Sequence, residues 1–182
     1  MSAHAIVKAS TAAAHSAIDV AFSRFDFADR DSYISFLETQ ARVIPAIEAV
    51  LGHDADLPAW RPRAALLTRD LDALGYRLPK PLAVSAPSSL AARFGLLYVI
   101  EGSRLGGRLL LRRVNPNFAS YYLSATHEPG EWRMFTRALD VRAQAESATW
   151  IEDVVAGASR GFQLFTLSAL ETFGASRLRS QT

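Results

Sequence analysis

His15 and Asp19 are the first residues in this chain whose types and spacing could do chemistry. They lie one helical turn apart in Thr11-Ala-Ala-Ala-His-Ser-Ala-Ile-Asp19, so the carboxylate can reach the imidazole ring. A carboxylate on one ring nitrogen fixes the tautomer and makes the other nitrogen a better metal ligand. The pair therefore predicts a metal ligand. Taken alone it also fits a surface histidine, because no second histidine follows at helical spacing.

A cluster of three glycines, Gly102, Gly106 and Gly107, interrupts the apolar segment from Tyr98 to Leu111. Each glycine in a helix interior costs about 0.5 to 1 kcal/mol relative to alanine. Such a cluster indicates that a flat ligand approaches the backbone closely, or that the helix bends. The alternative is close packing against another helix, for which the glycines at positions 157 and 161 are candidate partners.

The glycine cluster does not match the phosphate-binding motifs. Gly102 and Gly107 have the separation of the two P-loop glycines, but Arg108 and Leu109 stand where lysine and serine or threonine are required. The dinucleotide fingerprint also fails, because the glycine spacing is different and no strand-helix-strand pattern surrounds it. A phosphate-binding loop is therefore excluded.

The elements that position these residues are predicted to be helices. Apolar residues recur at helical spacing nearly everywhere, and alternating β-branched runs are missing. We predict one all-α domain over residues 1–174 and a frayed tail over 175–182. A cap at Asp29 or Asp31 and a kink at Pro45 are expected in the second helix. The predicted helices cover about 3–20, 29–51, 62–74, 88–115, 118–123, 131–139 and 142–173.

Composition limits the classes of function. The chain has 182 residues, a hydrophobic fraction of 49% and a formal net charge of +2. The absence of cysteine excludes a disulfide framework, a thiolate nucleophile and cysteine-bound zinc or iron–sulfur clusters. Arginines alternate with acids, which argues against nucleic acid. No signal peptide or membrane span is apparent, so a cytoplasmic protein is expected.

Together, the histidine and the glycine helix provide the two walls that a haem requires. The combination of Thr11-x-x-x-His15 with Leu97-Tyr-Val-Ile-Glu-Gly-Ser-Arg-Leu-Gly-Gly107 resembles the haem oxygenases, specifically their short bacterial biliverdin-producing branch. The likeness extends over nearly the whole chain in length, helix order and motif placement. It implies a single-domain haem oxygenase-like helical bundle in which a kinked glycine-bearing helix covers the distal face of haem.

The resemblance also implies roles for individual residues. His15 would be the proximal iron ligand, and Asp19 its hydrogen-bonded partner. Gly102 and Gly106 would be the distal glycines over the haem, and Gly107 would extend the opening. Ser103 stands where the animal enzymes have an aspartate that holds water near the bound oxygen. Because a hydroxyl carries no negative charge, proton delivery is expected to run through ordered water and backbone carbonyls.

Other residues match positions around the haem in that family. Lys8 lies where the family places a cation near the haem propionates, and Phe162 where it has an aromatic wall. Tyr121 is a further haem-binding candidate, together with Tyr122, Arg112 and Arg113, placed only by their proximity to the glycine helix. Glu101 is expected to brace that helix by hydrogen bonding.

The implied reaction is oxidative cleavage of haem, which is both cofactor and substrate, to biliverdin with release of carbon monoxide and ferrous iron. The implied partners are molecular oxygen, an external electron donor such as a ferredoxin or reductase, and a biliverdin acceptor such as a phytochrome. Two alternatives stay open at this point. One is a haem carrier or sensor with the same fold, and the other is a haem-free enzyme of the same superfold.

Overall fold

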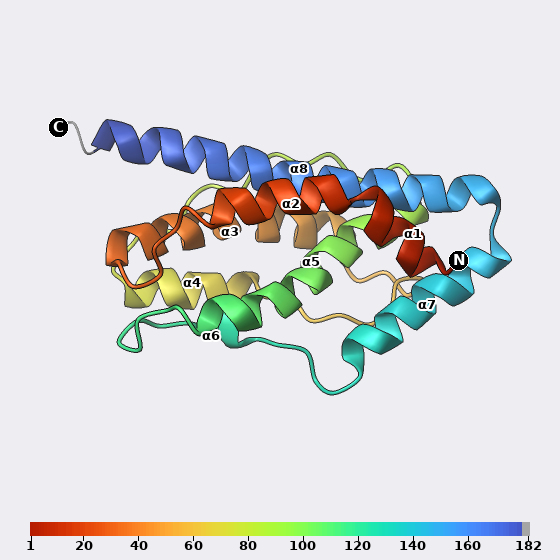
Figure 1. The fold of residues 1–182 in the computed structure, drawn as a ribbon, viewed down its shortest axis with the longest axis horizontal. Helices are drawn as coiled ribbons and strands as arrows, with labels where there is room; N and C mark the ends of the chain where they lie inside the picture. Colours follow the sequence, from red (N-terminus) through yellow and green to blue (C-terminus); the bar gives the residue numbers. More distant parts are fainter. Residues whose placement is uncertain (180–182) are drawn as a thin grey trace.

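The protein is a bundle of helices built around the pair α5 and α8 (Figure 1). In the computed structural model, which describes residues 1–179 and their side chains through residue 173, every regular element is a helix. The elements are α1 (Ala3–Ser10), α2 (Ala12–Phe22), α3 (Arg30–Leu51), α4 (Ala64–Ala73), α5 (Leu90–Leu111), α6 (Tyr121–Ser124), α7 (Glu131–Ala145) and α8 (Ala148–Arg179). The predicted all-α class is confirmed.

The first predicted helix is divided into two at Thr11. The Thr11 hydroxyl donates a hydrogen bond to the carbonyl of Val7 at 2.8 Å, and the Thr11 backbone leaves helical geometry with ψ near 4°. Threonine that bonds back to a carbonyl four residues earlier bends helices. The prediction of one continuous helix over 3–20 is therefore wrong. After the break, α2, which carries His15, runs at an angle to α1 (Figure 1).

The second predicted helix appears as α3 with the expected ends. The carboxylate of Asp29 accepts a hydrogen bond from the backbone N–H of Ser32 at 2.8 Å and caps its start. Gly52 ends α3 with φ of 57°, a value that favours glycine. Pro45 lies inside α3 as predicted. The residues of α3 that recur at helical spacing are buried throughout: Tyr33, Phe36, Leu37, Gln40, Ile44, Ile47 and Leu51.

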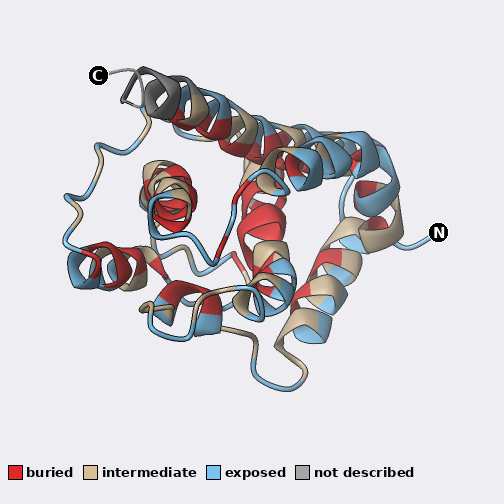
Figure 2. Ribbon diagram, turned by 60° about the vertical axis from the view of Figure 1, so that its left-hand side comes forward, coloured by how far each residue is buried: buried red, intermediate tan, exposed pale blue. Residues whose placement is uncertain are grey.

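Two glycines that face each other bring α5 and α8 into close contact. A Cβ atom on Gly95 would lie 2.2 Å from the carbonyl oxygen of Val154, and one on Gly157 would lie 2.2 Å from that of Ala92. Neither position can accept a side chain without a backbone shift. The middle of α5 is accordingly buried, as Figure 2 shows by its red colour.

The later helices differ from their predicted bounds. Helix α5 ends at Leu111, before the predicted stop at Asn115-Pro116. Helix α7 extends to residue 145, and the extended backbone of Glu146 separates it from α8, which the prediction had begun at residue 142. Helix α8 runs to Arg179, six residues beyond its predicted end. Of the predicted tail, residues 180–182 lie outside the described residues.

Helix α5 is continuous through its three glycines, so the predicted kink is not a break in the helix. Within the described part of the chain, no helix combines the length and apolarity needed to cross a membrane.

Candidate functional site

The site begins with the imidazole of His15 in the first turn of α2. Its Nδ1 atom lies 3.0 Å from Oδ2 of Asp19, so the predicted pair forms. The side chain of His15 is 62% exposed, which makes the ring accessible to a ligand. Because Asp19 occupies Nδ1, that nitrogen carries a proton and Nε2 keeps its lone pair for a metal.

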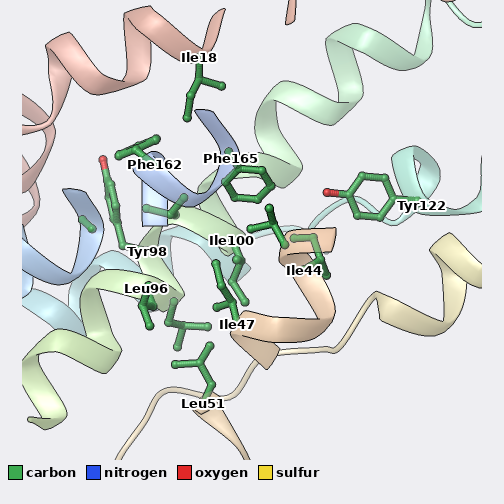
Figure 3. Packing of buried hydrophobic residues seen from close by; sticks show 14 of the residues in the cluster. Ile18, Ile44, Ile47, Leu51, Leu96, Tyr98, Ile100, Tyr122, Phe162 and Phe165 are labelled. Carbon is green, nitrogen blue, oxygen red and sulfur yellow. The ribbon is translucent and has the colours of Figure 1, made fainter. Parts of the chain in front are cut away.

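Phe162 of α8 contacts His15 and borders the same site. The two rings are 5.7 Å apart between centroids and nearly perpendicular, at 76°. Phe162 is buried, and in Figure 3 it lies between Ile18 of α2 and the interior of the core. An open apolar groove of about 470 Å³ runs along the seam of α2 and α8 beside this pair. Its lining consists of Ala14, Ala17, Phe162, Gln163, Thr166 and Leu167.

One turn of α8 connects His15 with the glycine helix. Phe162 contacts His15, and its neighbour Gly161 contacts Val99 of α5, where an added Cβ would lie 3.1 Å from the valine side chain. Val99 precedes Gly102 by three residues. Adjacent residues of α8 thus touch both predicted walls of the site and fix their separation.

The three clustered glycines have different surroundings. A Cβ on Gly106 would meet nothing within 4 Å, so this part of α5 faces open space. A Cβ on Gly102 would lie 3.6 Å from the ring of Trp132, which is ordinary contact. Gly107 is buried and faces Leu123 of α6 at 3.5 Å, on another side of the helix. Packing against α8 requires Gly95 and Gly157 and does not explain this cluster.

Apolar side chains surround the open face at Gly106. Leu105 and Leu109 of α5 are 48% and 65% exposed. Exposed apolar side chains beside a bare helix backbone form a surface that an apolar, flat ligand can cover. The residues present therefore fit a haem: a histidine with a fixed tautomer, an aromatic edge and an open apolar helix face.

Ser103 points away from this face into a buried polar cluster. Its hydroxyl donates to the carbonyl of Ile100 at 2.7 Å and accepts a hydrogen bond from the guanidinium of Arg63 at 2.6 Å. Arg63 is almost fully buried and lies over the ring of Tyr122 at 4.7 Å. Its backbone N–H donates to the carboxylate of Glu48, whose pKa is raised by burial. Sequence analysis missed Arg63, which lies 40 residues from Ser103.

Tyr122 completes this cluster from α6. Its hydroxyl donates to Oε1 of Gln40 at 2.9 Å, and in Figure 3 the hydroxyl is directed toward the middle of the core. Burial raises the pKa of Tyr122, while Arg63 and a hydrogen bond to Ser103 lower it. The carboxylate of Asp70 accepts the backbone N–H groups of Tyr121 and Tyr122 at 2.7 and 2.9 Å, which holds the start of α6 in place.

Glu101 braces α5, as predicted, through a buried ion cluster. Its two carboxylate oxygens each lie 3.0 Å from a partner, Nε of Arg104 and Nε2 of His127. Arg104 also donates to the carbonyl of Ala125 at 2.9 Å and to that of Arg61. Burial lowers the pKa of Arg104. Sequence analysis did not identify His127, which reaches Glu101 because the loop before α7 folds back onto α5.

The remaining predicted residues lie around the bundle. Lys8 is exposed in the last turn of α1. Tyr121 is 44% exposed, and the guanidinium of Arg69 covers its ring at 3.9 Å, which joins it to α4. Arg113 donates to the carbonyl of Phe25, and Arg112 is exposed. The described contacts thus join His15, Asp19 and Phe162 directly, whereas they connect Tyr121 to a different helix.

Known proteins resemble this chain, although no family model matches it. A curated protein named heme oxygenase, from Xanthomonas campestris pv. campestris (strain 8004), is 38% identical to it. The alignment covers 75% of this chain and 88% of that protein. The chain belongs to the haem oxygenase family. It is therefore an enzyme of the oxidoreductase class, and its family membership implies haem binding.

A solved structure extends the haem oxygenase likeness to nearly the whole fold. The NO- and CO-bound heme oxygenase of Neisseria meningitidis superposes with a TM-score of 0.80 at 26% identity, covering 96% of this chain and 93% of that one. The predicted haem oxygenase-like bundle is confirmed by this match.

Proposed function

We propose that this enzyme binds haem between α2 and α5 and cleaves it to biliverdin, carbon monoxide and ferrous iron. The observation that carries the proposal is the arrangement at one turn of α8, where Phe162 contacts His15 and Gly161 contacts the glycine helix. When bound, haem supplies both the iron that activates oxygen and the carbon that is attacked. The protein supplies position, orientation and proton control.

His15 holds the iron through Nε2, and Asp19 keeps the ring in the required tautomer by accepting from Nδ1. A thiolate ligand donates electrons strongly and so favours cleavage of the O–O bond. A neutral imidazole lacks this donation. Gly106, whose Cβ position is open, would let the backbone of α5 approach the other face of the haem closely, and Gly102 would lie one turn away at the edge that Trp132 covers.

Proton delivery would run through ordered water and backbone carbonyls, and a buried polar cluster around Ser103 lies behind α5. The Ser103 hydroxyl bonds the carbonyl of Ile100, and Arg63 donates to both. Gln40 adds a buried amide nitrogen that makes no hydrogen bond to any residue the structure describes. Such a group can donate to an ordered water. The Ser103 hydroxyl itself is engaged by Ile100 and Arg63, so its role would be to hold this cluster against α5.

The further partners and cation contacts belong to the same proposal. Lys8, exposed in the last turn of α1, would pair with a haem propionate, and Phe162 would form the aromatic wall. Gly107 and Tyr121 take part indirectly, through α6. An external donor such as a ferredoxin or reductase supplies electrons, and the biliverdin is transferred to an acceptor such as a phytochrome.

The test is a hemin titration followed by aerobic reduction, observed by absorption spectroscopy. We expect a Soret band on binding and its replacement by the biliverdin spectrum on reduction. In His15→Ala the ferric spectrum should change because the ligand is lost. A stable haem spectrum in the reduced, aerated wild type would instead identify a haem carrier. An unchanged ferric spectrum in His15→Ala would show that another residue binds the iron.

A further inference from the structure

Trp132 of α7 lies along the row of α5 residues that leads to the open face. Tyr98, Gly102 and Gly106 follow one another at four-residue spacing and so share one side of α5. The ring of Trp132 is 5.6 Å from that of Tyr98 and 3.6 Å from the Cβ position of Gly102. At Gly106, one turn further, nothing lies within 4 Å of that position. Trp132 therefore covers the row up to Gly102 and leaves it open beyond.

The ring of Trp132 is held in this position from several sides. It stacks on Phe135 at 5.5 Å, meets the ring of His4 edge-on at 5.8 Å and lies 5.9 Å from that of His127. His127 is fixed to α5 by its bond to Glu101, the residue next to Gly102. The ion cluster thus attaches the segment before Trp132 to the same turn of α5 that the indole contacts.

We propose that Trp132 is a specificity-determining residue of the haem site, the side chain against which one edge of the macrocycle stops. This inference rests on the proposed function. A flat ligand on the Gly106 face can extend along α5 only as far as the indole, so the indole limits its in-plane position. That position determines which meso carbon lies under the distal backbone. Glu101 and His127 are positioning residues that act through Trp132.

The deciding variant is Trp132→Phe, which keeps the stacking on Phe135 and removes the outer ring from Gly102. Two readouts are compared: the biliverdin isomer ratio and the haem methyl shifts in the proton NMR spectrum of the cyanide-bound ferric protein. The methyl shifts report haem seating without turnover. We expect a second set of methyl signals. The share of the minor biliverdin isomer should grow by about three- to tenfold, because this is the change in population that the loss of one aromatic contact produces. Trp132→Leu should enlarge both effects.

Control variants test whether the position of the haem depends on Trp132 in particular. Val141→Ala alters an exposed side chain more than two turns along α7 and should leave both readouts unchanged. His127→Ala should shift both readouts in the direction of Trp132→Phe. His127→Gln should restore them, because an amide nitrogen can replace Nε2 as donor to Glu101. If wild type binds no hemin, the proposed function fails. If it binds and cleaves haem while both Trp132 variants keep the wild-type isomer ratio and methyl pattern, the role of Trp132 is overturned.

Discussion

If His15 is the iron ligand, as proposed, its hydrogen bond to Asp19 determines which nitrogen of the imidazole is available to the metal. The carboxylate accepts from Nδ1, and the partial negative charge it transfers makes Nε2 more basic. Both side chains are more than half exposed, so the bond contributes to ligand quality more than to folding.

Asp19→Asn should therefore weaken the iron–histidine bond and leave the fold unchanged. The amide oxygen can still accept from Nδ1, but it carries no charge. We expect a lower iron–histidine stretching frequency in the ferrous protein by resonance Raman spectroscopy, and hemin affinity reduced about tenfold or more, as for other partners of metal-bound histidines. An unchanged frequency would mean that Asp19 does not tune the ligand.

Gly106 and Gly107 provide a matched pair for testing the open face. Gly106→Ala should stabilise the haem-free protein by about 0.5 to 1 kcal/mol, since the added methyl meets nothing and alanine favours helix. The same methyl should reduce hemin affinity. Gly107→Ala adds its methyl on the side of Leu123 and should reduce hemin affinity less than Gly106→Ala does. Urea unfolding and hemin titration measure both effects. Equal hemin affinity in the two variants would remove Gly106 from the site.

At the scale of helices, the contact between α5 and α8 depends on glycines outside the predicted cluster. In Gly157→Ala the methyl would overlap the backbone of Ala92, and backbone cannot move aside as a side chain can. We expect a loss of about 3 kcal/mol in the free energy of unfolding, the upper end of overpacking costs. Urea unfolding checks the value. If Gly157→Ala lowers the free energy of unfolding by less than an ordinary surface substitution does, the close contact between α5 and α8 does not contribute to stability.

Asp70 makes the anchoring of α6 dependent on pH. Burial raises the pKa of Asp70 above its usual value of 3.8, against the opposing effect of the N–H groups of Tyr121 and Tyr122. Since the folded pKa is the higher one, protonation favours the folded state. The contribution is complete below pH 3.8 and is lost as pH rises through the folded pKa.

Asp70→Asn removes this titration. The free energy of unfolding of wild type minus that of Asp70→Asn should therefore increase as the pH falls from 7 toward 4, and become constant below 3.8. Urea unfolding of both proteins across this range gives the difference. A difference that decreases on acidification would contradict the raised pKa of this carboxyl.

Sequence patterns predicted the helices whose ends carry local signals. Asp29 and Ser89 cap α3 and α5, and Gly52 ends α3. Such ends can be read from the sequence because a cap depends only on neighbouring residues. The break at Thr11 was missed because a threonine hydroxyl can point outward or bond back, and periodicity does not distinguish the two. The partners of Ser103 and Glu101 were missed because Arg63 and His127 are distant in sequence.

At the scale of the whole molecule, the site is assembled from both ends of the chain. His15 comes from α2 and contacts Phe162 of α8, while Gly106 comes from α5, so the proposed site forms only in the folded protein. Figure 1 shows the first and last helices side by side along one face, in agreement with their contacts. Hemin binding should therefore stabilise the entire fold.

The expected gain is about 2.7 kcal/mol at a free hemin concentration one hundred times the dissociation constant. Calorimetric melting with and without hemin measures it as a rise in Tm. His15→Ala should lose most of the rise at the same hemin concentration while keeping the Tm of the hemin-free protein. An equal rise in both proteins would indicate that hemin associates elsewhere on the surface.

The two ends of α5 differ in their surroundings. Near Gly95 the helix is interlocked with α8, backbone against backbone, whereas near Gly106 one face is open and the opposite side still packs on α6 through Gly107 and Leu123. Helix α5 is thus held at both ends but is uncovered on a single face. We expect the entry of substrate and the departure of product to take place at this open face, so that the hydrophobic core need not be disturbed in each catalytic cycle.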